Sequence, residues 1–187
     1  MDVYFMGIDQ SFTSTGIVIL NRFGTVIFTE IIQTDKKLSD FQRSWNIFYR
    51  IYHIIQQYGI KYIGIEGLAF GKFGNATRSL AILQGVLVTN LLYLKELGST
   101  ITSVDTNVEI ITPTTLKKFA TGAGRADKTA VIKNIPDYIL KRWREQYHAK
   151  CINDLADAYF LAKYMLQTTK LPLIKIILKE REGTATT

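Results

Sequence analysis

Three short apolar segments at the start of the chain limit its fold more than any other feature. Residues 3–8, 16–20 and 25–32 are rich in Val, Ile, Phe and Thr, and short polar turns separate them. Such turns are too short for a crossover connection, so consecutive segments must pair antiparallel. The chain therefore opens with a predicted three-strand meander.

Helical and strand patterns alternate after the meander. Apolar side chains recur at three- and four-residue spacing from Leu38 to Ile55, and Gly59 then stands where a helix can end. These positions predict an amphipathic helix of about five turns. The further predicted elements are a strand at 61–67, a helix at 75–97 closed by Gly98, a strand at 108–112, and helices over 113–166 with breaks at 121–124 and near Pro136.

Length and composition favour one globular domain. The chain has 187 residues, 47% of them hydrophobic, which is enough for a proper core. We predict a folded domain over 1–170 and a C-terminal tail over 171–187. No secretory signal or membrane-spanning segment is expected, and therefore no membrane partner. The single cysteine, Cys151, suits the reducing cytoplasm.

Positive charge is concentrated in one part of the chain. The net charge is +7, and between Pro113 and Lys150 nine Lys or Arg residues stand against three acids. A solvated basic face is the commonest explanation of such a segment. A binding surface for a polyanion such as nucleic acid is the more specific one. Charge alone leaves both interpretations open.

Four acidic residues stand near the ends of predicted elements. Asp9 ends the first strand and Glu66 the fourth, whereas Asp154 and Asp157 share one face of the last helix. Taken singly, each has a structural explanation, because acids favour the first turn of a helix and polar residues often end strands. Brought together, the four would repel one another, and a fold tolerates such a group only where cations neutralise it.

The donor chemistry narrows the choice of metal. Carboxylate oxygens favour Mg²⁺ or Mn²⁺ over zinc. The sequence contains only His53 and His148, which argues against a histidine zinc site and against a Ser-His-Asp triad. A magnesium site is therefore predicted if the fold brings the four acids together.

Four segments in a fixed order carry a family resemblance. They are "GIDQSFTSTG", "GIEGLAFGKFGNATRSLAILQGVL", "ITPTTLKKFATGAGRADK" and "NDLADAYFLA". Together they resemble the RuvC-type Holliday junction resolvases of the ribonuclease H-like superfamily, over residues 6–166. The resemblance implies an α/β fold whose five-stranded mixed sheet combines a three-strand antiparallel meander with two parallel strands, flanked by helices. It also implies a bacterial or phage-type endodeoxyribonuclease that cuts four-way junctions and other branched DNA.

The resemblance also implies a set of site residues. Asp9, Glu66, Asp154 and Asp157 match the metal-binding catalytic acids, with Asp9 as the ligand shared by two Mg²⁺ ions, for which Mn²⁺ substitutes. Lys128 would hold the phosphate during hydrolysis, which leaves a 5′-phosphate. Either Phe70 or Phe73 would enter the junction. The predicted DNA-binding residues are Phe70, Lys72, Phe73, Arg78, Lys117, Lys118, Arg125 and Lys128.

A two-fold homodimer is expected, because a four-way junction offers two symmetric strands to cut. We assign the helix at 75–97 to the interface. Gly85 in its interior is costly for a helix and has two explanations, close approach of a second helix or packing in the core of the same chain.

Two other functions are compatible with parts of the sequence. The segment "GIDQSFTSTG" also resembles the first phosphate loop of actin-like ATP-binding proteins. A non-catalytic DNA-binding module of the same fold is the second alternative, although a pure binder gains nothing from acids beside phosphate. Residues 98–107 and the tail after Gln167 have no counterpart in the family pattern.

Overall fold

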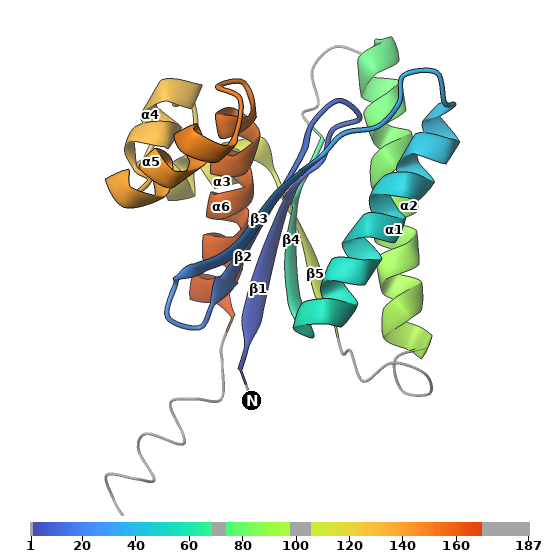
Figure 1. Cartoon of the computed structure of the whole chain (residues 1–187), viewed down its shortest axis with the longest axis horizontal. Coiled ribbons are helices and arrows are strands. Elements are labelled where there is room, and N and C mark those ends of the chain that lie inside the picture. Colours follow the sequence, from blue (N-terminus) through green and yellow to red (C-terminus); the bar gives the residue numbers. More distant parts are fainter. Residues whose placement is uncertain (1, 69–73, 98–105, 170–187) are drawn as a thin grey trace, which may run out of the picture.

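The computed structural model describes residues 2–68, 74–97 and 106–169 of the chain, and its centre is one mixed sheet (Figure 1). The sheet order is β3-β2-β1-β4-β5. Pairing is antiparallel among the first three strands and parallel from β1 to β4 and from β4 to β5, which confirms the predicted sheet. The strands are β1 (Tyr4–Asp9), β2 (Thr15–Asn21), β3 (Val26–Ile32), β4 (Tyr62–Glu66) and β5 (Asn107–Ile111).

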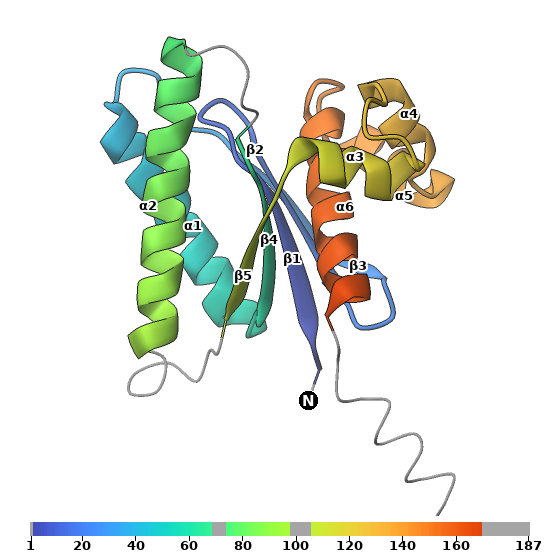
Figure 2. The same ribbon diagram turned by 180° about the vertical axis from the view of Figure 1, so that it is seen from behind.

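Helices cover both faces of the sheet (Figures 1 and 2). Two long helices pack on one face, and four helices from the C-terminal half of the domain pack on the other. The first pair is α1 (Asp40–Tyr58) and α2 (Asn75–Leu97), and the second group is α3 (Pro113–Thr121), α4 (Lys128–Lys133), α5 (Asp137–Gln146) and α6 (Cys151–Thr168).

Alternation along the strands builds a separate apolar core on each face. Met6 and Ile8 of β1 pack with the α1–α2 layer, whereas Phe5 packs with the layer that contains α6. All three side chains are fully buried. Because successive side chains point to opposite faces, the continuous apolar run of β1 suits a central strand that is buried on both sides.

Two glycines let α6 lie unusually close to the sheet. A Cβ at Gly7 would overlap the backbone of Ala158, and a Cβ at Gly16 would lie 2.5 Å from the carbonyl oxygen of Asp154. Any larger side chain at these positions would push the helix outward. The glycines therefore set how near the first turns of α6 come to the end of β1.

Most predicted element ends agree with the structure. Gly59 ends α1 in the left-handed conformation at φ 61°, and a capping box of Ser39 and Gln42 begins that helix. Gly122 ends α3 in the same way, within the predicted break at 121–124. The sequence prediction missed a third break, at 147–150 between α5 and α6. The predicted end of α2 at Gly98 and the tail at 171–187 lie outside the described residues.

Helix α2 is apolar but poorly covered by the rest of the chain. The segment Thr77–Leu94 of this helix is long and apolar enough to cross a membrane, judged by length and composition alone, and 17% of the segment is buried. Leu83, Leu87 and Leu91 are buried in the core, whereas Leu92 and Tyr93 are 49% and 59% exposed. The structure thus leaves an apolar face of α2 exposed. The sequence analysis did not identify this helix as long and apolar enough to span a membrane.

Candidate active site

The predicted acids lie where the C-terminal ends of β1 and β4 meet the N-terminal end of α6 (Figures 1 and 2). Asp9 is the last residue of β1 and Glu66 the last of β4. Because these two strands are parallel neighbours, their final side chains emerge at the same edge of the sheet. Asp157 reaches the same place from the second turn of α6.

Three carboxylates form one cluster. Asp9, Glu66 and Asp157 each offer an oxygen, and these oxygens all lie within 4.8 Å of one another. Asp9 is only 9% exposed, and the other two acids are partly buried. The fold therefore brings together three of the four predicted acids from three separate elements.

Asp154 stands beside this cluster and not within it. Its carboxylate accepts a hydrogen bond of 2.5 Å from the hydroxyl of Ser14, in the turn between β1 and β2. Sequence analysis missed Ser14, although it lies in the hydroxylic turn after Asp9. Spacing in the sequence gives no signal for this pair, because the two residues are 140 positions apart.

Burial and mutual repulsion shape the protonation of the acids. Burial raises the pKa of Asp9 well above its usual value, and the charges of Glu66 and Asp157 raise that pKa further. Burial also raises the pKa of Asp157 to about 7, with Glu66 acting in the same direction and Lys128 against it. The pKa of Asp154 is raised by burial, against the hydrogen bond from Ser14. Ionisation of the cluster is therefore costly unless a cation compensates it.

The donor set fits a divalent cation. Three converging carboxylate oxygens are the ligands that Mg²⁺ and Mn²⁺ prefer. Burial first, and the charges of Glu66 and Asp157 second, raise the pKa of Asp9, and a bound cation would offset both effects by favouring the ionised acid. The cluster is thus consistent with a metal site.

Two predicted lysines lie close enough to act on this site. The charge of Lys128, at the start of α4, lowers the pKa of both Asp154 and Asp157, and that of Lys117 in α3 lowers the pKa of Asp157. Lys128 is exposed and Lys117 half-buried. Both cations therefore border the acids on the side formed by α3 and α4.

Of the other predicted DNA-binding residues, the structure describes some and not others. Lys118, Arg125 and Arg78 are exposed. Among the described residues the one ion pair within 4 Å joins Arg50 to Glu30, so the Lys and Arg residues of the basic segment form no salt bridge there at that distance. Three predicted residues, Phe70, Lys72 and Phe73, lie outside the described residues.

Gln10 is a second residue that the sequence analysis missed. Its side-chain amide donates to the backbone oxygen of Glu66 and to Oε1 of Gln84 on α2, both at 2.8 Å. The residue follows Asp9 directly, but neither partner can be read from the sequence pattern. Gln10 therefore joins the ends of β1 and β4 to the helix behind them.

This fold and site define a class of protein. A mixed sheet of this order, with acids at the ends of two neighbouring strands and on the helix beside them, is that of a ribonuclease H-like nuclease. Residues 5–162 match the family described as crossover junction endodeoxyribonuclease RuvC, so the chain belongs to the RuvC family. These are the Holliday junction resolvases that the sequence motifs resemble.

Particular relatives agree with this assignment. The crossover junction endodeoxyribonuclease RuvC of Treponema denticola is 31% identical over 130 residues, which cover 67% of each chain. The Thermus thermophilus RuvC structure has a TM-score of 0.62 at 20% identity, over 88% of this chain and 95% of that one. The structure of T. thermophilus RuvC in complex with Holliday junction substrate has a TM-score of 0.65 at 17% identity, over 88% of this chain and 96% of that one. These bacterial relatives lend no support to the predicted phage origin.

Proposed function

We propose that this chain is a Mg²⁺-dependent endonuclease that resolves Holliday junctions by cutting symmetric strands. The observation that carries the proposal is the cluster of Asp9, Glu66 and Asp157 on a RuvC-family scaffold, with oxygens within 4.8 Å. Four-way junctions are the substrate class, because a Holliday junction is bound in the structure of the T. thermophilus relative.

Each acid has a distinct place in the proposed chemistry. Asp9, on the central strand, would be shared between two Mg²⁺ ions, and Glu66 and Asp157 would each complete the shell of one ion. Asp154, tethered by Ser14, would orient the attacking water or complete the second shell. When bound, two such ions supply a nucleophile at neutral pH and stabilise the leaving oxygen.

The basic residues would bind the DNA backbone. Lys128 borders the acids and would hold the scissile phosphate, while Lys117, Lys118 and Arg125 would follow the strand away from the site. Contacts of this kind position the substrate without reading its sequence. Phe70 or Phe73 remains the predicted side chain that enters the junction.

A homodimer is proposed through α2. A Cβ at Gly85 would meet nothing within 4 Å among the described residues, so core packing does not explain this glycine, and the open space beside it supports close approach of a second helix. Leu92 and Tyr93 are exposed on the same helix. A second copy would bury this apolar face and place a second active site for the second strand.

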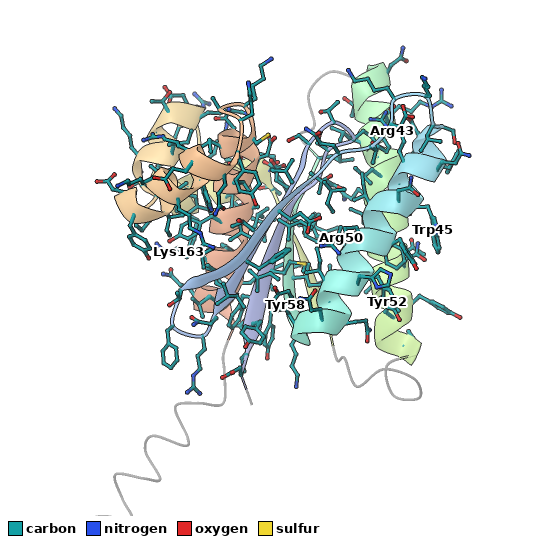
Figure 3. All side chains as sticks on the ribbon, in the orientation of Figure 1. Arg43, Trp45, Arg50, Tyr52, Tyr58 and Lys163 are labelled. Atoms are coloured by element: carbon teal, nitrogen blue, oxygen red, sulfur yellow. The ribbon has the colours of Figure 1, made fainter. Side chains whose placement is uncertain are left out.

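Aromatic side chains of α1 extend the proposed interface. An apolar hollow of about 260 Å³ lies between α1 and α2 and is lined by Trp45, Tyr49 and Tyr93 among others. Figure 3 shows Trp45 on the outer side of α1, whereas Arg50 extends toward the sheet and pairs with Glu30. The hollow gives a partner helix a place to insert side chains.

One experiment tests the function directly. A synthetic four-way junction and a duplex of the same sequence are incubated with the protein, with and without Mg²⁺. We expect paired symmetric cuts in the junction only when Mg²⁺ is present. Cutting without metal, or equal cutting of the duplex, would contradict the proposal. Binding without cutting would instead favour the non-catalytic module, and ATP binding the actin-like alternative.

A further inference from the structure

The backbone pairing of β1 with β4 ends just before the residues that carry the carboxylates. Backbone pairing between these two strands stops at Ile8 and Ile65, one residue before Asp9 and Glu66. On the outer sides pairing continues, so that Asp9 pairs with β2 and Glu66 with β5. Asp9 and Glu66 therefore stand at the place where the backbone pairing between β1 and β4 has ended.

The Gln10 amide supplies a bond where this pairing has ended. Its Nε2 donates to the Glu66 backbone oxygen and to Oε1 of Gln84 at 2.8 Å each, so both amide hydrogens are used. Gln10 is 7% exposed, and hydrogen bonds are stronger where water is excluded. One side chain thus connects β1, β4 and α2 immediately behind the acids.

This arrangement has a cost that the fold alone does not explain. The Oε1 atom of Gln10 is buried and has no hydrogen-bond partner among the described residues. A buried acceptor without a partner destabilises a protein, whereas an apolar side chain of the same shape avoids that penalty. The amide of Gln10 is therefore better explained by its hydrogen bonds to Glu66 and Gln84 than by a gain in overall stability.

We propose that Gln10 and Gln84 are positioning residues that hold the ends of β1 and β4, and with them Asp9 and Glu66, at a fixed separation. The clamp acts chiefly on the metal-free site, because a bound cation would itself hold the two carboxylates together. It keeps the carboxylates at the separation that the first ion needs. The inference rests on the proposed metal-dependent function and adds residues that act on metal capture.

Direct metal binding tests the clamp. Full-length Gln10→Met and Gln84→Met proteins are titrated with Mn²⁺ in the absence of DNA, beside wild type and the exposed control Gln56→Met on α1. We expect Mn²⁺ to bind roughly tenfold more weakly to both clamp variants. The control should match wild type. Gln84→Glu keeps an acceptor for the Gln10 amide and should bind Mn²⁺ at least as tightly as wild type.

Junction cleavage gives a second readout. The Mg²⁺ concentration for half-maximal rate should rise by the same factor in the Met variants, while the rate at saturating Mg²⁺ should return to that of wild type. Unchanged Mn²⁺ affinity in both variants, or a rate that saturating Mg²⁺ does not recover, would overturn the inference. If Gln10→Met does not fold, the partly exposed Gln84 carries the test. A wild-type protein that binds Mn²⁺ but leaves junctions intact would refute the proposed function without touching the clamp.

Discussion

Ser14 and Asp154, 140 residues apart in the chain, are joined by a hydrogen bond of 2.5 Å from hydroxyl to carboxylate. The bond fastens the turn after β1 to the first turn of α6. The accepting atom is Oδ2 of Asp154, and this acid is not one of the three whose oxygens lie within 4.8 Å of one another.

Ser14→Ala should therefore impair cleavage while the fold survives. Without the hydroxyl, Asp154 is free to leave its position, and loss of such a supporting contact typically lowers metal affinity or activity by roughly 10- to 100-fold. Thr13→Ala, at the exposed neighbouring residue, is the matched control. Cleavage rates on a four-way junction, measured beside thermal unfolding, compare the two. Equal rates for both variants would exclude a supporting role for Ser14.

Asp9→Asn should abolish cutting and leave a folded protein. The amide keeps the shape of the carboxylate but removes a negative charge from the site where we propose that Mg²⁺ binds. Junction affinity without metal should stay the same or rise, because less negative charge faces the phosphates. Thermal melting, junction cleavage and junction binding, measured on one preparation, check the expected fold, activity and affinity. A merely structural Asp9 would give the reverse, a loss of about 1–3 kcal/mol in stability with a proportionate loss of activity.

The metal-free protein should lose stability as the pH rises from 5 to 8. The pKa of Asp157 is about 7 in the folded state against an ordinary 3.8, so between these values the folded state keeps a proton that the unfolded state has lost. Stability then falls by at most about 1.4 kcal/mol per pH unit from this group and levels off above pH 7. We expect Mg²⁺ to raise Tm at pH 8, and Asp157→Asn to reduce the metal-free pH dependence, of which Asp9 and Asp154 keep a part. A flat Tm in the wild type would argue against this account of the site.

Lys118→Ala and Arg125→Ala should each weaken junction and duplex binding together. Each exposed cation that contacts a phosphate releases counterions, so its removal should reduce the slope of log affinity against log salt by about one unit. Lys61→Ala is the control, because this exposed residue precedes β4 at the opposite end of the sheet. Unchanged slopes for both variants would mean that this segment is only a solvated basic face.

Leu92→Glu should yield a folded monomer that no longer cuts junctions productively. A carboxylate on the open face of α2 would have to be buried without a partner in the dimer, whereas in the monomer it stays in water. Phe23→Glu, at a side chain that is 76% exposed in the β2–β3 turn, controls for the added charge. The mass of each protein in solution at micromolar concentration shows whether it is a monomer or a dimer. A wild-type monomer that retains cleavage would contradict the proposed dimer.

The periodic parts of the fold could be predicted from the sequence because local patterns determine them. The meander, α1 and α2 follow from strand alternation, helical spacing and, for α1, the end signal at Gly59. The break at 147–150 could not, since it contains neither Gly nor Pro and the apolar spacing continues on both sides. There the packing of α5 and α6 decides, through long-range contacts such as Trp143 against Tyr159.

The acids could be predicted for a similar reason, but their exact grouping could not. Asp9, Glu66 and Asp157 stand at element ends, and topology alone brings those ends together. Asp154 is hydrogen-bonded to Ser14, and Gln10, which follows Asp9, is hydrogen-bonded to Gln84. Both are side-chain partnerships between distant residues, which no spacing rule in a single sequence reveals.

Gly7 and Gly16 carry only a hydrogen atom where other residues carry a side chain. This lets α6 lie close to the sheet and so helps to align the acids. In a genetic screen for loss of junction cutting, we expect alleles at these glycines beside those at the acids, because an added methyl group would displace Asp154 and Asp157 together. Second-site suppressors should be scarce. The obstacle is the backbone of α6 and not one of its side chains, so no shortening of a residue on that helix can make room.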